Sequence, residues 1–115
     1  MGRHGNRPVA MVASSPHYWV DHIVTNPPYS LAREFVDHAL KVTHGKVAML
    51  LKLNFLEGQK RAKWFPTTPL RNVHVFSRRV SFARGDGEDG GAGLLAYAWF
   101  VWERNYKGKP TIDWI

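Results

Sequence analysis

The spacing of apolar residues changes along the chain, and each change marks a different predicted element. Residues 20–25 contain a short β-branched run, which predicts a strand covered on both faces, as in a parallel sheet. Residues 31–41 place apolar side chains every three to four positions, which is typical of an amphipathic helix. Residues 46–53 are almost continuously apolar and of strand length. Together they predict a strand–helix–strand unit with parallel strands.

The ends of the predicted helix are marked by residues with known end preferences. Ser30 has a side-chain oxygen suited to the N-cap, and Lys41 suits the negative carboxyl end. Gly45 suits the left-handed residue that often follows a helix. The apolar stripe of the helix consists of Leu31, Ala32, Phe35, Val36, Ala39 and Leu40.

The second half of the chain predicts one more helix and three more strands. Residues 58–65 read as a short basic helix that Pro66 stops. Residues 71–77 alternate between apolar and polar, which predicts a strand. Residues 94–103 form an aromatic strand, and residues 111–115 are a candidate last strand.

The length of 115 residues fits a single domain with one ordinary core. We expect residues 1–16 to be an arm with at most one short strand, and residues 17–115 to form the folded unit. The chain has no cysteine, which excludes disulfides, thiolate metal sites and cysteine nucleophiles and fits a reducing, cytoplasmic location. It contains no long apolar segment, so we expect no membrane partner.

The chain is basic, with a net charge of +7, and its cations are clustered. A charge surplus that only aids solubility is one interpretation, and attraction to a polyanion such as nucleic acid is the other. The clustering of the cations favours the polyanion. Trp64 lies among these cations and is a candidate platform for stacking bases, whereas Trp99 and Trp102 are expected in the core. The predicted nucleic-acid-binding residues are Lys60, Arg61, Lys63, Trp64, Arg78, Arg79 and Arg84.

Several common site chemistries find no support in the sequence. Residues 85–90 match the glycine pattern of a dinucleotide loop, but three acidic residues lie within residues 85–90 and the following segment is strand-like, so we expect a turn between two strands. The six histidines show no metal-ligand spacing, and we expect no metal site. No serine has the glycines of a nucleophile elbow, which disfavours an acyl-transfer hydrolase.

The motif Asn26-Pro27-Pro28-Tyr29, with Ser30 after it, lies between the first predicted strand and the helix. Two prolines end ladder pairing and hold a stiff turn at the carboxyl end of the strand, which is where open α/β sheets bind ligands. A proline turn whose asparagine bonds its own backbone is the purely structural alternative.

At these residues the sequence resembles the DNA adenine-N6 methyltransferases, whose catalytic motif is (D/N/S)PP(Y/F/W). The likeness to phage and prophage members extends over residues 17–115, through residues 21–31, 76–82 and 98–103. The resemblance implies a partial Rossmann-like, S-adenosylmethionine-dependent methyltransferase fold: the second half of the sheet, with parallel strands and an antiparallel carboxyl-terminal strand inserted between its neighbours.

The resemblance also implies roles for the motif. The Asn26 side-chain oxygen and the Pro27 carbonyl would accept the two hydrogens of the adenine amine, directing its lone pair at the methyl of S-adenosylmethionine. Tyr29 would stack on the flipped base, while Pro28 and Ser30 support the turn. The same Asn26 and Pro27 would be the chain's part of the cofactor site.

The sequence departs from the family ahead of this motif, because it has neither the Gly-rich loop nor the acidic residue that hold the cofactor. We therefore expect a methyltransferase or a fragment of one, whose sheet is cut at the strand before Asn26. An exposed apolar edge there predicts a homo-oligomer or a complementing chain. The alternatives are a non-catalytic nucleic-acid-binding remnant and a protein-glutamine methyltransferase, whose motif grips a side-chain amide.

Overall fold

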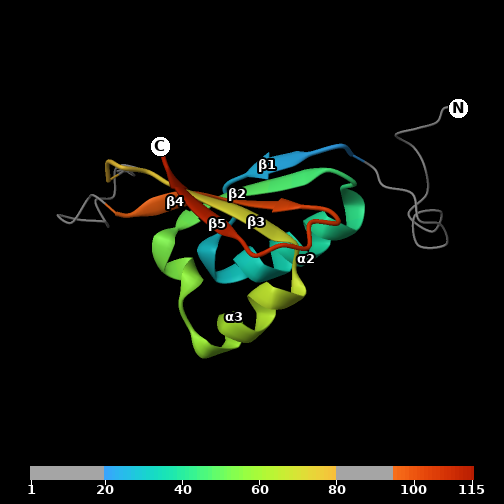
Figure 1. Ribbon diagram of the computed structural model, residues 1–115, viewed down its shortest axis with the longest axis horizontal. Coiled ribbons are helices and arrows are strands. Elements are labelled where there is room, and N and C mark those ends of the chain that lie inside the picture. Colours follow the sequence, from blue (N-terminus) through green and yellow to red (C-terminus); the bar gives the residue numbers. More distant parts are fainter. Residues whose placement is uncertain (1–19, 80–94) are drawn as a thin grey trace, which may run out of the picture.

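The computed structural model describes residues 20–79 and 95–115, and a mixed five-stranded sheet forms its centre (Figure 1). The strands are β1 (Ile23–Thr25), β2 (Lys46–Lys52), β3 (Leu70–Val75), β4 (Tyr97–Glu103) and β5 (Thr111–Trp114), in the spatial order β1-β2-β4-β3-β5. β1 pairs with β2 and β3 with β5 in parallel, whereas β4 is antiparallel to both of its neighbours. The predicted α/β class with parallel and antiparallel strands is confirmed. The antiparallel strand between its neighbours is β4, whereas the last strand, β5, lies at the edge of the described sheet and is parallel to β3, so the prediction for the last strand is wrong.

The predicted strand–helix–strand unit is also confirmed. Helix α2 (Ala32–Val42) connects β1 to β2, and the two strands pair from Ile23 with Val47 to Thr25 with Met49. α2 buries a stripe consisting of Ala32, Val36 and Ala39. This stripe is narrower than the predicted one, because Leu31 is 47% exposed and Phe35 is 41% exposed.

The N-terminus of α2 differs from the prediction. A 3-10 turn, η1 (Tyr29–Leu31), precedes the helix, so the N-cap position falls on Leu31 and not on Ser30. No side chain makes a capping hydrogen bond there. Ser30 is exposed within the turn. The prediction of Ser30 as the N-cap is wrong because the second proline forces a tight turn before regular helix can begin.

The C-terminus of α2 also ends differently. The helix passes into Thr43 in extended conformation, and Gly45 does not adopt a positive φ, so the predicted left-handed role of this glycine is wrong. Glycine is needed at position 45 for another reason. A Cβ atom there would overlap the Asp21 carbonyl oxygen and the His22 ring, because the entries to β1 and β2 lie against each other.

Helix α3 (Gln59–Trp64) follows the 3-10 turn η2 (Leu53–Leu56) and ends in a second turn, η3 (Phe65–Thr67), which contains Pro66. This is the short basic helix that the sequence predicts. Both α2 and α3 lie on the same side of the sheet (Figure 1).

The core lies between the sheet and these helices and is rich in aromatic residues. Phe55 is at its centre, 1% exposed, with ring centroids at 5.5 Å from Phe100 and 6.0 Å from Trp64. Trp102 is fully buried and lies 6.2 Å from the Trp64 ring. Phe55 also makes an edge contact with Tyr29 at 6.0 Å, so the core reaches directly to the predicted catalytic turn.

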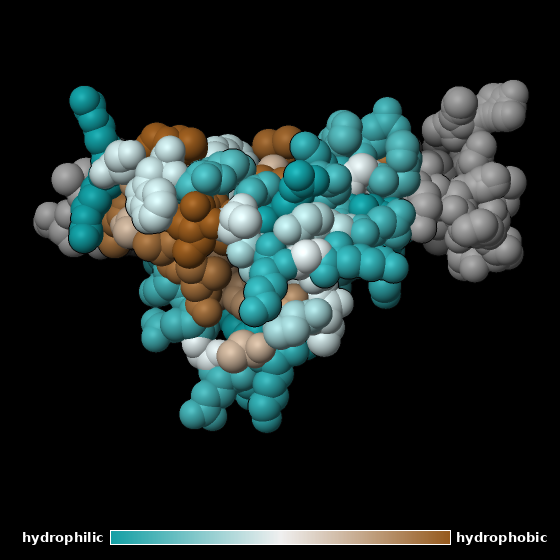
Figure 2. Space-filling view, in the orientation of Figure 1, coloured by the Kyte–Doolittle hydropathy of each residue, from teal (hydrophilic) through white to brown (hydrophobic). Residues whose placement is uncertain are grey.

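Among the described residues, β1 is an edge strand of the sheet and β5 is the other edge. Val24 on β1 is 68% exposed, and Trp114 on β5 is 69% exposed. Figure 2 shows hydrophobic surface around the carboxyl end of the chain, next to hydrophilic surface. The apolar edge predicted at β1 is therefore present in the described part of the chain. The predicted arm, residues 1–16, lies outside the described residues.

Candidate functional site at the carboxyl ends of β1 and β2

The turn after β1 holds its backbone in a fixed path. Pro27 is buried and Pro28 has φ −59° and ψ 133°, the extended conformation that a proline ring favours. The Leu31 N–H donates to the Pro28 carbonyl oxygen at 3.0 Å and closes the turn. Asn26 is exposed at the entrance to this turn. The local sequence thus fixes the backbone while leaving the Asn26 side chain at the surface.

Tyr29 is held by the segment that follows the neighbouring strand. Its hydroxyl donates to the Asn54 side-chain oxygen at 2.8 Å and accepts from Arg61 Nη1 at 3.2 Å. Because β1 and β2 are parallel, their carboxyl ends meet at one edge of the sheet, and this brings Asn54 close to the motif. Residues of three segments, η1, η2 and α3, therefore set the position of one aromatic ring.

Two cations lie close to the Tyr29 ring. The Arg61 Cζ atom is 5.3 Å from the ring centroid and 4.6 Å from the Phe55 centroid. The Lys52 Nζ atom is 5.4 Å from the Tyr29 centroid. All three distances lie within the range of a cation–π contact. The surroundings of Tyr29 are therefore electropositive as well as aromatic.

A small hollow of about 170 Å³ opens beside the motif, at the ends of β1 and β2 and the beginning of β4. Tyr97 contributes to its wall because β4 pairs with β2 so that Tyr97 lies opposite Lys52. The lining residues are Asn26, Pro27, Tyr29, Leu50, Leu51, Lys52 and Tyr97. The hollow thus combines an amide, two phenol rings and an ammonium group with two leucine residues of β2.

The two oxygens to which the family resemblance gives the acceptor role have no partner in the described part of the chain. No hydrogen bond among residues 20–79 and 95–115 involves the Asn26 side chain, and none is accepted by the Pro27 carbonyl. By contrast, the Pro28 carbonyl and the Tyr29 hydroxyl are both occupied. The structural alternative, in which Asn26 bonds its own backbone, is therefore absent from the described residues.

The described residues that line the hollow do not form a complete site for S-adenosylmethionine. The lining of the hollow contains no aspartate or glutamate that could bind ribose hydroxyls. The only glycine with a positive φ in the described residues, Gly58, lies before α3 and not after a strand that faces the hollow. Asn26 and Pro27 could face the methyl group, but a complete cofactor site requires residues other than these.

The basic residues of α3 separate into two kinds. Lys60 and Lys63 are exposed, whereas Arg61 is half-buried against Tyr29 and Phe55. Trp64 is 5% exposed and donates from Nε1 to Asp37 Oδ1 at 3.2 Å. The prediction that Trp64 is an exposed stacking platform is therefore wrong, because this side chain faces the core and its polar atom is bonded to α2.

The remaining predicted cations lie farther along the same edge of the sheet. β3 runs in the same direction as β2, since β4 is antiparallel to both, so Arg78 and Arg79 follow β3 at the edge where Asn26 follows β1. Both are exposed. β2 and β4 separate them from the motif. Arg84 lies outside the described residues. The expected core position of Trp102 is confirmed, while Trp99 is half-buried on the opposite face of β4.

Sequence reasoning missed four residues of this site. Lys52, Asn54 and Tyr97 surround the motif, and Arg33 on α2 lies with its Cζ atom 5.3 Å from the Trp64 centroid. Asn54 had a usable signal, since it follows β2 as Asn26 follows β1. Lys52, Tyr97 and Arg33 come close to the motif only through strand pairing and helix packing.

No known protein family matches the chain, and no curated protein matches it. None of the helices in residues 20–79 and 95–115 has the length and hydrophobicity needed to span a bilayer. Within the same residues, no three histidine, aspartate or glutamate side chains gather closely enough to hold a metal ion. The function proposed for this chain therefore rests on the geometry of the site and on the sequence motif.

Proposed function

We propose that this chain is an S-adenosylmethionine-dependent DNA adenine-N6 methyltransferase, or a fragment of one that carries its adenine site. Asn26, Pro27 and Tyr29 are the proposed catalytic residues, and Pro28 and Ser30 support the turn. The observation that supports the proposal most directly is the pair of unpartnered acceptors, the Asn26 side-chain oxygen and the Pro27 carbonyl, beside a positioned aromatic ring.

The proposed mechanism uses these acceptors to change the electronic state of the adenine amine. The amine is a poor nucleophile because its lone pair is delocalised into the ring. Accepting its two hydrogens at Asn26 and Pro27 favours a pyramidal nitrogen with a localised lone pair. A turn fixed by two prolines holds both oxygens in place before the base arrives, so little reorganisation is needed.

Tyr29 is proposed to hold the base in the hollow. A base inside a duplex must leave the stack before its amine can be reached, and an aromatic ring compensates part of the lost stacking. The hydroxyl contacts with Asn54 and Arg61 fix the ring orientation in advance. When bound, S-adenosylmethionine supplies the electrophilic methyl group. Residues not described by the structure would have to complete its site.

Adenine recognition can be tested with single-stranded oligonucleotides that differ at one base. Fluorescence anisotropy compares a strand containing one adenine with the same strand containing purine, which lacks the amine. Two hydrogen bonds at about 0.5–1 kcal/mol each predict roughly 5- to 30-fold tighter binding of the adenine strand. Asn26→Ala removes one of the two acceptors and should reduce the preference to roughly 2- to 5-fold, whereas Asn26→Asp keeps an oxygen acceptor and should retain the full preference. Equal binding of both strands by the unmodified chain would contradict the proposal.

A second candidate function is nucleic-acid binding without methyl transfer. The absence of a carboxylate in the described lining of the hollow favours it. Calorimetry with S-adenosylmethionine separates the two functions. Heat of binding, followed by incorporation of labelled methyl into DNA, supports the enzyme. Salt-sensitive DNA binding with no cofactor binding supports the second function for this chain acting alone.

DNA and a second polypeptide are the proposed partners, in the cytoplasm of a bacterial or phage-infected cell. No strand among residues 20–79 and 95–115 pairs with the outer edge of β1, and Val24 there is 68% exposed, which supports association with another copy or with a complementing chain. Light scattering at high protein concentration tests this directly. A strictly monomeric chain would argue against self-association at this edge.

A further inference from the structure

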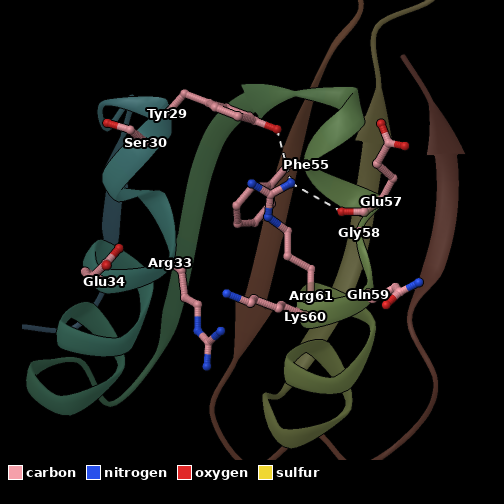
Figure 3. A pocket seen from close by; sticks show the side chains of 10 residues that line it. All are labelled: Tyr29, Ser30, Arg33, Glu34, Phe55, Glu57, Gly58, Gln59, Lys60 and Arg61. Atoms are coloured by element: carbon pink, nitrogen blue, oxygen red, sulfur yellow. Dashed lines mark hydrogen bonds between the residues drawn. The ribbon is translucent and has the colours of Figure 1, made fainter.

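A second hollow lies on the other side of Tyr29, between α2 and α3, with a volume of about 420 Å³ (Figure 3). Three cationic side chains from two helices line it, namely Arg33 on α2 and Lys60 and Arg61 on α3. In Figure 3 Arg33 and Lys60 extend toward the same space below Tyr29. Two carboxylates, Glu34 and Glu57, also lie at its wall.

The cations of this hollow are not neutralised by the described residues. None of the salt bridges formed among residues 20–79 and 95–115 involves Arg33, Lys60 or Arg61. Glu57 points away from the Arg61 guanidinium, and only its backbone carbonyl contacts that group (Figure 3). Three cations against two carboxylates leave the lining of the hollow with an excess of positive charge, which favours a bound anion.

The Arg61 guanidinium is held so that its edge formed by Nε and Nη2 faces the hollow between α2 and α3. Its Nη1 group donates to the Tyr29 hydroxyl at 3.2 Å and to the Glu57 carbonyl at 3.3 Å. Its Nε and Nη2 groups have no hydrogen-bond partner among the described residues, and they face α2 in Figure 3. These two groups form the parallel fork that matches the oxygens of a phosphate. Since Arg61 is half-buried and packed on Phe55, the fork is preorganised.

We propose that this hollow binds a phosphodiester group of a DNA strand, with Arg61 as the bidentate ligand and Arg33 and Lys60 as supporting cations. Tyr29 joins this hollow to the proposed adenine site, because its hydroxyl accepts from Arg61 and its ring lines both spaces. A nucleotide with its base on Tyr29 therefore places a neighbouring phosphate near Arg61. The inference rests on the proposed function for the identity of the strand.

The test measures how binding of a labelled single strand depends on salt. The variant Arg33→Gln/Lys60→Gln removes two cations from the hollow, and Lys41→Gln/Lys107→Gln removes two exposed cations elsewhere in the described residues. Each lost phosphate contact on a single strand lowers the magnitude of the slope of log K against log salt by about 0.7, and the hollow holds one phosphate, so we expect the first variant to lose up to about 0.7 and the control to keep its slope. Equal slope changes in both variants would overturn the proposal.

Two additional measurements separate the possible failures. Arg61→Lys keeps the charge but removes the fork, and it should weaken binding about tenfold while circular dichroism shows an unchanged fold. If the double variant is unfolded, Lys60→Gln alone should still lower the magnitude of the slope, by less than about 0.7.

Strands of thymine only should show the same slope loss in the double variant, since the phosphate hollow does not read bases. If the double variant shows the expected slope loss but the unmodified chain shows no preference for adenine, the adenine site is refuted and the phosphate site is not. Inorganic phosphate that competes as well as the strand would refute a polynucleotide ligand.

Discussion

The hydrogen bond between Tyr29 and Asn54 gives the sharpest prediction about how the site is built. Tyr29→Phe removes the hydroxyl that donates to Asn54 at 2.8 Å and accepts from Arg61 at 3.2 Å. Asn54→Ala removes only the first of these contacts. Because the Asn54 side chain is exposed, water replaces part of the lost bond, so its worth lies in the lower half of the usual range, about 0.5–1 kcal/mol.

A double-mutant cycle isolates this bond. We expect Asn54→Ala to lower the free energy of unfolding by about 0.75 kcal/mol and Tyr29→Phe by about 1–2 kcal/mol, because the second change also removes the Arg61 contact. The loss of unfolding free energy in the double variant should be about 0.75 kcal/mol smaller than the sum of the losses in the two single variants. Urea unfolding measures this, and with an m-value of about 1.5 kcal/mol/M the Asn54→Ala midpoint falls by about 0.5 M.

Asn26 provides the matched control for this cycle. Its side chain has no hydrogen bond among the described residues, so Asn26→Ala should change the free energy of unfolding by less than about 0.5 kcal/mol and should be additive with Tyr29→Phe. A coupling between Tyr29 and Asn54 no larger than the Asn26 control value would refute the account of how Tyr29 is positioned.

Two further substitutions test the packing around the site by urea unfolding. Trp64→Ala should lower the free energy of unfolding by about 3–5 kcal/mol, since Trp64 is 5% exposed and bonded to Asp37, and a loss below about 1 kcal/mol would indicate an exposed ring. Gly45→Ala should cost about 1–3 kcal/mol because the new Cβ overlaps the Asp21 carbonyl and the His22 ring, and an unchanged midpoint would contradict that close approach.

The sequence predicted the elements of this fold where hydrophobic periodicity was long and regular. The apolar run of β2 and the stripe of α2 each span enough residues to fix both type and approximate bounds. The turn between β1 and α2 was placed correctly by its two prolines. The N-cap was placed incorrectly, because a 3-10 turn shifts it from Ser30 to Leu31. Periodicity does not distinguish a 3-10 turn from a first helical turn.

The face presented by α3 could not be predicted from the sequence. The helix has six residues, too few for periodicity to indicate which side is buried. Its basic neighbours suggested that Trp64 is exposed, but the side chain turns inward because Asp37 on α2 accepts its Nε1–H and because Phe55 and Trp102 pack beside it. The buried position of Trp64 therefore depends on contact partners that are distant in the sequence.

The candidate site was predictable in its motif and not in its surroundings. Asn26 and Tyr29 were identified from a short pattern at a strand end, whereas Lys52, Tyr97 and Arg33 join the site through strand pairing and helix packing. Tyr97 lies opposite Lys52 because of the register between β2 and β4. No tight turn of fixed length joins these two strands, so the sequence alone does not set their register.

The central claim is that Asn26 grips the amine of adenine, and nuclear magnetic resonance tests it most directly. Deoxyadenosine and purine deoxyriboside, which differ only in that amine, are titrated into the protein while the side-chain amide of Asn26 and the ring of Tyr29 are observed. We predict shifts of both with deoxyadenosine, and a shift of Tyr29 alone with the purine nucleoside. Equal responses of Asn26 to the two nucleosides, or no response to either, would contradict the claim.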